Sequence, residues 1–258
     1  MKKFDKKGTN EPEKKAVVKP EIVNKTENAD LNAISGKQAN IINTKRITAM
    51  GMFCAIAFVF KLVSDLVPPI MPAAPFLSYD AKDIILAISG FILGPLPAFI
   101  ITVITSLIEM ITVSSTGFYG LAMNIFSSSM FCIIPAIFYK KFKNLGGAVV
   151  GLALGIVSTT AAMLLWNYVI TPIYMGYPRE AVAKMLVPVF LPFNLIKTGI
   201  NASLSMLLYK PGVSAMRQVN LIEKKENDKT KINIVLIITC VAILAVCALA
   251  IILINNVK

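Results

Sequence analysis

Apolar residues form long runs along this chain, and short polar or proline-rich stretches separate the runs. A helix needs about 20 apolar residues, at 1.5 Å each, to cross a hydrocarbon core of roughly 30 Å. Most of the runs approach or exceed that length, so the pattern predicts an all-α membrane protein. We expect helices over residues 47–67, 81–93, 98–113, 121–139, 146–170, 185–209 and 232–254.

The polar stretches divide the chain into parts. Residues 1–43 are rich in Lys, Glu, Asn and Thr, so we expect a disordered cytoplasmic tail. The first apolar run begins too far from the start for a signal peptide, and we expect none. A membrane domain over 44–211, a polar linker over 212–231 and an additional transmembrane helix over 232–254 complete the predicted organisation.

The run 185–209 differs from the others because Lys197 lies in its middle. About 12 residues, or roughly 18 Å of helix, separate Lys197 from either end, so its side chain cannot reach the headgroups. A buried ammonium costs from about 2.5 to more than 10 kcal/mol unless it faces water, a partner or a ligand. Four polar residues share its helix face: Asn194, Lys197, Asn201 and Ser205. We therefore predict a binding face here, with an ion pair between Lys197 and an intramembrane acid such as Glu109, which would only orient helices, as the purely structural alternative.

The segment Pro68–Asp80 contains four prolines and cannot be helical, yet it is apolar. We expect it either to form a lid over a pocket or to rest at the membrane interface, and both options remain open. Asp80 is placed to cap the helix that follows.

The net charge of +12 indicates membrane topology rather than nucleic-acid binding, because the lysines cluster at the edges of the apolar runs. With the amino terminus inside, the basic clusters near 45–46, 140–143 and 210–231 are cytoplasmic. Lys82 is then one of the few basic residues expected outside. The candidate polar groups converge on a pocket that faces outward.

The composition argues against an enzyme. The chain has no histidine and no phosphate-binding loop, and its four cysteines lie in apolar runs without metal-ligand spacing. Amide, charged and aromatic side chains suit a small, planar ligand with several hydrogen-bonding groups. The candidate pocket residues are Asn124, Asn167, Asn194, Lys197, Glu109, Trp166, Tyr168, Phe193 and, from the loop, Phe76, Leu77 and Tyr79.

Three separated motifs resemble the riboflavin-specific substrate-binding subunit of energy-coupling factor (ECF) transporters. They are Phe76–Pro95, Met123–Ser128 and Leu191–Lys197, in the order and at the spacing of that family. The resemblance covers about 45–211 and implies a six-helix transmembrane bundle, to which 232–254 adds one helix.

By resemblance, the subunit captures riboflavin at the outer face of the cell membrane. It delivers the vitamin for ATP-driven uptake with a membrane coupling subunit and two cytoplasmic ATPase subunits. Riboflavin is then the transported ligand, and no cofactor is implied. The resemblance places Asn167, Asn194 and Lys197 at the isoalloxazine ring and makes the loop 68–79 a gate.

Gly51 and Ala55 match the small-xxx-small motif by which this family docks its coupling subunit. Packing within the chain is the alternative reading. Two other functions also stay open: a subunit of the same architecture for another vitamin or a flavin nucleotide, and a self-sufficient secondary transporter in which Glu109 and Lys197 relay protons. A single cation argues against a dedicated phosphate site, and no internal repeat supports a secondary transporter.

Overall fold

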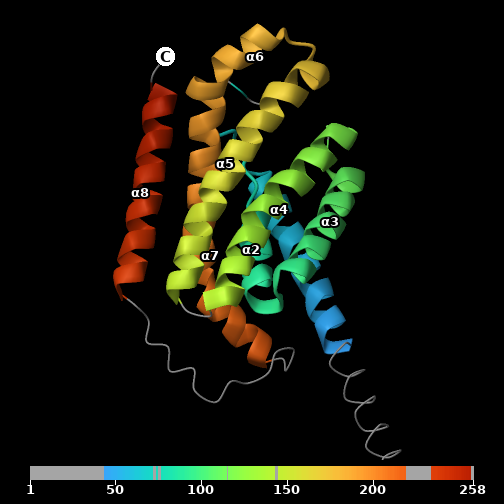
Figure 1. Cartoon of the computed structure of the whole chain (residues 1–258), viewed down its shortest axis with the longest axis vertical. Helices are drawn as coiled ribbons and strands as arrows, with labels where there is room; N and C mark the ends of the chain where they lie inside the picture. Colours follow the sequence, from blue (N-terminus) through green and yellow to red (C-terminus); the bar gives the residue numbers. More distant parts are fainter. Residues whose placement is uncertain are drawn as a thin grey trace, which may run out of the picture. The chain divides into compact units, whose positions relative to one another are not determined.

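The computed structural model describes residues 44–71, 74, 77–114, 116–142, 145–218 and 234–256. The predicted tail, Phe76 and most of the predicted linker lie outside the described residues. Within them, the chain is helical and contains no strand (Figure 1). The helices are an initial helix over Thr44–Ser64, α2 Lys82–Leu93, α3 Pro95–Thr112, α4 Gly117–Phe142, α5 Leu145–Met175, α6 Arg179–Met185, a π-helical turn η1 Leu186–Phe190, α7 Leu191–Gln218 and α8 Ile234–Asn256.

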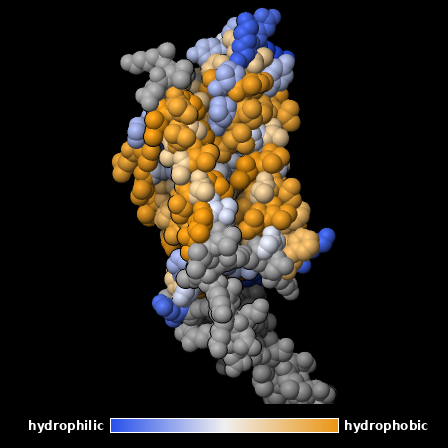
Figure 2. Space-filling view, turned by 90° about the vertical axis from the view of Figure 1, so that its left-hand side faces the viewer, coloured by the Kyte–Doolittle hydropathy of each residue, from blue (hydrophilic) through white to orange (hydrophobic). Residues whose placement is uncertain are grey.

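Six of the described helices are long and apolar enough to cross a membrane, with α6, η1 and the first part of α7 counted as one span. Figure 2 shows one face of the molecule, where hydrophobic side chains form a broad surface between hydrophilic ends. The prediction of an all-α membrane protein with an additional carboxy-terminal helix is confirmed.

The short helix α2 lies inside the bundle. Ten of its twelve residues are buried, and it packs against α3, α4 and α7. A helix that is apolar on all sides after its first turn has no face suited to water, so it is surrounded by other helices. Its first-turn charges at Lys82 and Asp83 are therefore buried as well.

Two helices extend beyond the predicted ranges. The loop expected over 171–184 is mostly helical, because α5 continues through Pro172 to Met175 and α6 begins at Arg179. Gly176 adopts a φ of 67° in the short connection between them, a conformation that glycine adopts without strain. At the other end of the bundle, α7 continues through Pro211 to Gln218, so helix enters the range assigned to the linker.

The loop between the initial helix and α2 folds back onto the bundle. Ile70, Met71, Ala74 and Leu77 are buried, and they share a hydrophobic cluster with residues of α6, η1 and α7. Removing such side chains from water stabilises this position by about 1.5 to 3 kcal/mol for each large one. The loop is therefore packed against protein in this structure.

The additional helix α8 packs against α7 (Figure 1). Cys247 of α8 joins the same hydrophobic cluster as the loop, and Cys240 joins a second cluster with residues of α2, α4, α5 and α7. All four cysteines of the chain are free and buried, as expected for small packing residues.

Candidate functional site

A cavity of about 520 Å³ lies where five helix ends and the loop meet. Because consecutive membrane helices alternate in direction, the end of one lies beside the start of the next. The lining thus includes residues near the carboxyl ends of the initial helix, α3 and α5 and near the amino ends of α4 and α7. Its polar residues are Lys61, Asp65, Ser78, Asp80, Glu109, Ser114, Thr116, Asn124, Asn167, Thr171, Asn194 and Lys197.

One side of the cavity carries the amides and aromatic rings predicted from the sequence. Asn194, Lys197 and Phe193 come from α7, while Trp166 and Asn167 come from α5. The Trp166 ring stacks on Phe126, with 5.1 Å between ring centroids. These side chains offer a flat apolar surface edged by hydrogen-bonding groups.

Asn194 is positioned by the π-helical turn that precedes it. Two prolines near the turn, Pro188 and Pro192, cannot donate backbone hydrogen bonds, which favours a local departure from the α-helical pattern. The Asn194 side-chain amide donates to the Phe190 carbonyl at 2.8 Å. Among the described residues its side-chain oxygen has no hydrogen-bond partner, so this oxygen remains available to a ligand.

The Asn167 side chain is already hydrogen-bonded within the protein through both its nitrogen and its oxygen. Its amide donates to the Met163 carbonyl at 2.8 Å, and its side-chain oxygen accepts a hydrogen bond from Thr171 at 3.0 Å. Both partners lie on α5, so the side chain is oriented by its own helix. One amide hydrogen of Asn167 remains for a ligand.

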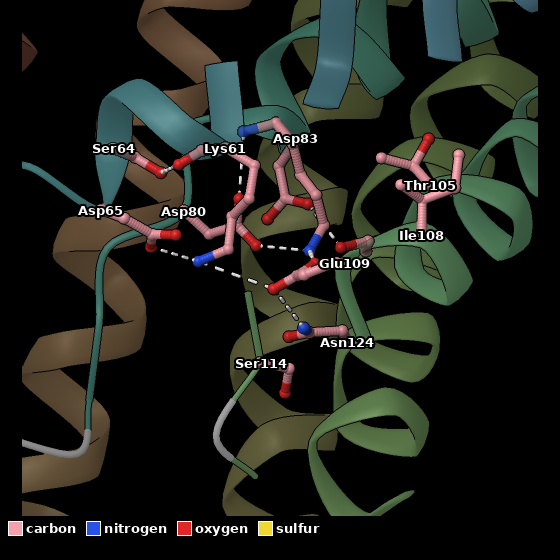
Figure 3. A network of polar contacts seen from close by, with 12 residues as sticks. Lys61, Ser64, Asp65, Asp80, Asp83, Thr105, Ile108, Glu109, Ser114 and Asn124 are labelled. Carbon is pink, nitrogen blue, oxygen red and sulfur yellow. Dashed lines mark hydrogen bonds and ion pairs between the residues drawn. The ribbon is translucent and has the colours of Figure 1, made fainter. Parts of the chain in front are cut away.

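The initial helix, the loop, α3 and α4 bring charged and amide side chains to the same cavity lining, and Figure 3 shows the polar network that these residues form. Lys61 of the initial helix contacts Asp65 and lies 3.5 Å from a Glu109 oxygen. The same Glu109 oxygen accepts a hydrogen bond from Asn124 at 2.9 Å. Glu109 and Asn124 were predicted as site residues, whereas Lys61, Asp65 and Asp80 were not. A helical pattern would have found Lys61 and Asp65, because the i, i+4 spacing puts them on one face near the helix end.

Lys82 is the most deeply buried charge in this network. It was predicted on the outer side of the membrane and given no partner; its side chain is 0% exposed and pairs with Glu109 and with Asp80, the latter at 2.6 Å. Burial alone would raise the pKa of Asp80, but the ammonium groups of Lys82, Lys197 and Lys61 lower it to about 2. Asp80 also accepts the Lys82 backbone N–H at 3.1 Å, although the cap position of α2 is Ala81 and Asp80 lies one residue before it.

Lys197 does not pair with Glu109 in the structure. Its ammonium lies 3.7 Å from an Asp83 oxygen, while the contacts of Glu109 are with Lys82, Lys61 and Asn124. Lys197 also lines the cavity, so it remains accessible to a bound molecule. Glu109 is therefore not the partner of Lys197, but the structural alternative of an ion pair with a buried acid is met by Asp83.

Of the remaining described residues that were predicted for the site, one lines the cavity and the others do not. Leu77 lines the cavity, and Phe76 lies outside the described residues. Tyr79 does not line it, because its hydroxyl donates to the Asn201 side chain at 2.6 Å and fixes the end of the loop to α7. Tyr168 is 43% exposed on the surface of α5 and is not part of the site.

Gly51 and Ala55 are both exposed on the initial helix and precede the cavity-lining Lys61 in the sequence. No atom lies within 4 Å of the position a Gly51 side chain would occupy. Packing of Gly51 within the chain is therefore wrong for the described residues. Because glycine has no side chain and alanine only a methyl group, the helix surface is low at these two exposed positions.

The geometry defines a class of protein. A cavity at the ends of transmembrane helices, lined by aromatic, amide and charged side chains, suits a small molecule with both apolar and polar parts. Among the described residues, no group of His, Cys, Asp or Glu side chains is arranged to hold a metal ion. The fold and the cavity together define a membrane-embedded binding protein for a small molecule.

Similar proteins narrow this class. Residues 45–209 match the family described as "ECF transporter, substrate-specific component". The chain therefore belongs to this family of substrate-specific components, and α8 lies beyond the matched residues.

Two relatives and one solved structure align with this chain over nearly their whole length. "Riboflavin transporter FmnP" of Bacillus subtilis (strain 168) is 27% identical over 70% of this chain and 100% of the relative. "Riboflavin transporter RibU" of Staphylococcus aureus (strain TCH60) is 24% identical over 71% of this chain and 98% of the relative. A structure described as "Structure and mechanism of the S component of a bacterial ECF transporter" shares the fold, with a TM-score of 0.57 and 24% identity over 68% of this chain and 99% of the other.

Proposed function

We propose that this protein binds riboflavin with high affinity at the outer face of the cell membrane and presents it for ATP-driven uptake. The observation that carries the proposal is the cavity lining, in which Lys197, Asn194 and Asn167 occur together with the aromatic residues Trp166 and Phe193. An isoalloxazine ring is flat, apolar on its faces and lined with acceptors and a donor at one edge. The names of the relatives, all riboflavin transporters, support the same ligand.

The charged side of the cavity suits the sugar-alcohol chain of riboflavin. Hydroxyl groups both donate and accept, so they can bond to the carboxylates of Asp65 and Glu109 and to the ammonium of Lys61. A cavity of about 520 Å³ lies within the usual range of small-molecule sites, roughly 300–1,000 Å³.

Uptake requires partners. Family membership supports assembly with an ECF module, which we propose to consist of a membrane coupling subunit and two cytoplasmic ATPase subunits. The exposed Gly51 and Ala55 are the proposed docking strip for the coupling subunit, because small residues one turn apart permit close helix approach.

A titration of the purified chain with riboflavin, thiamine and flavin mononucleotide in parallel tests the proposed ligand. Tight binding of riboflavin alone supports it, and stronger binding of thiamine or no binding of riboflavin contradicts it. Uptake in cells that lack every ATPase partner would instead support a self-sufficient transporter.

A further inference from the structure

Asp83 lies directly behind the wall of the cavity. Its carboxylate is 1% exposed and does not line the cavity, yet both its oxygens are engaged. One oxygen accepts a hydrogen bond from Ser128 of α4, and the other lies 3.7 Å from the Lys197 ammonium of α7. Asp83 therefore connects three helices through one side chain.

The location of Asp83 makes it a rigid counter-ion. It sits in the first turn of α2, where the helix dipole stabilises a negative charge. Because α2 is packed between α3, α4 and α7, its backbone has little freedom to move. The hydrogen bond from Ser128 then fixes the carboxylate itself.

Lys197 needs such a counter-ion to point in one direction. A lysine side chain is long and flexible, and three other carboxylates, those of Asp80, Asp65 and Glu109, line the same cavity. Without Asp83, the ammonium would turn toward one of these carboxylates and away from the aromatic side of the cavity. Each binding group must be held in its productive orientation for its hydrogen bond to contribute fully to affinity.

We propose that Asp83 is a positioning residue that sets the orientation of Lys197 toward the ligand and does not touch the ligand itself. The inference rests on the proposed binding of riboflavin by Lys197. It also predicts that Ser128 contributes indirectly, because its hydroxyl orients the Asp83 carboxylate.

A double-mutant cycle on the full chain tests this role, with riboflavin as the probe and its fluorescence as the readout. Asp83→Asn keeps the shape of the side chain and removes the charge. We expect it to weaken riboflavin binding at least about fivefold in the otherwise unchanged chain. In a Lys197→Ala background, the same substitution should change the affinity less than about twofold, because the group it orients is absent.

Ser89→Ala is the matched control. Ser89 is buried on the same helix, donates to the Leu86 carbonyl and does not line the cavity. This variant should bind riboflavin as the unchanged chain does. A general loosening of α2 would instead lower affinity in the control and in both Asp83→Asn backgrounds.

Additive effects of Asp83→Asn and Lys197→Ala would overturn the proposal, as would unchanged affinity in the single Asp83→Asn variant. If Asp83→Asn fails to fold, Ser128→Ala takes its place. A loss of affinity of about twofold or more that disappears with Lys197→Ala supports the role, and an equal loss in both backgrounds overturns it. If the unchanged chain binds no riboflavin, the proposed function fails together with this inference. If the unchanged chain binds riboflavin tightly and Asp83→Asn binds it equally well, only the inference is refuted.

Discussion

Lys82 and Glu109 form an ion pair in which neither side chain is more than 5% exposed. Asp80 completes the arrangement at 2.6 Å from the same ammonium. Removing one member of a buried ion pair costs about 3–5 kcal/mol, because the remaining charges lose their partner. We therefore predict that Lys82→Met lowers the stability of the purified protein by about that amount, measured as the thermal transition in detergent.

Lys184→Met is a control for the loss of a lysine as such. Lys184 is exposed on α6, so its replacement should leave the transition nearly unchanged. Equal transition temperatures for the two variants would contradict a structural role for the buried pair.

Lys197→Ala and Asn194→Ala should each weaken riboflavin binding by at least ~1 kcal/mol, about fivefold in the dissociation constant. Each substitution leaves ligand atoms without a hydrogen-bond partner in a site that excludes water. Leu195→Ala provides the comparison, because Leu195 lies between them in the sequence but is 44% exposed on the outer side of α7. Affinity that stays the same in both site variants would refute the proposed role of this helix face.

Flavin mononucleotide should bind at least about tenfold more weakly than riboflavin. The cavity lining contains two lysines and three carboxylates, so it presents a net negative charge to a phosphate group. Asp65→Asn removes one of these charges and should narrow the difference between the two ligands. Equal affinities of the unchanged chain for both flavins would show that the charge balance does not determine selectivity.

Tyr79→Phe should destabilise the packed loop by about 1 kcal/mol, because the Asn201 oxygen loses its donor. Burial, and then the charges of Asp83 and Asp80, raise the pKa of the Tyr79 hydroxyl above its ordinary value. A raised pKa means that this stabilisation is fully present below about pH 10 and is lost only at higher pH. The stability difference between the two proteins should therefore be constant from about pH 6 to pH 9, and a decline within that interval would contradict the assignment.

Gly51→Leu should prevent co-purification with the coupling subunit and leave riboflavin binding unchanged. A Cβ at this exposed position meets none of the surrounding atoms within 4 Å, so we expect the chain to fold as before. Val63→Leu, which places the same side chain at a residue that is 57% exposed on the same helix, should still permit assembly. An intact complex with Gly51→Leu would place the docking surface elsewhere.

The binding face of α7 could be predicted because it depends on the spacing of residues within one helix. Asn194 and Lys197 line the cavity, as the polar stripe indicated. The other two residues of the polar stripe bind protein instead of lining the cavity. Asn201 donates to the Asp80 carbonyl, and Ser205 donates to the Ile84 carbonyl. Spacing alone does not distinguish a polar residue that meets a ligand from one that fixes a neighbouring segment.

The charged wall of the site was mostly missed for a related reason. Lys82 was given no role in the site because basic residues usually mark the edges of membrane helices, and its partner Glu109 is 27 residues away. The signal that could have revealed it is the run Ile84–Phe91, which is apolar on every side and indicates a helix surrounded by protein. Charges in the first turn of such a helix must be buried and paired.

The state of the four native cysteines makes this chain convenient for probing motion. All four are free and buried, so thiol-directed reagents should react with them only slowly in the folded protein. A cysteine introduced at the cavity rim, for instance in place of Thr116, would then carry the only readily labelled thiol. A fluorophore or spin label there could follow opening and closing of the entrance without first engineering a cysteine-free background.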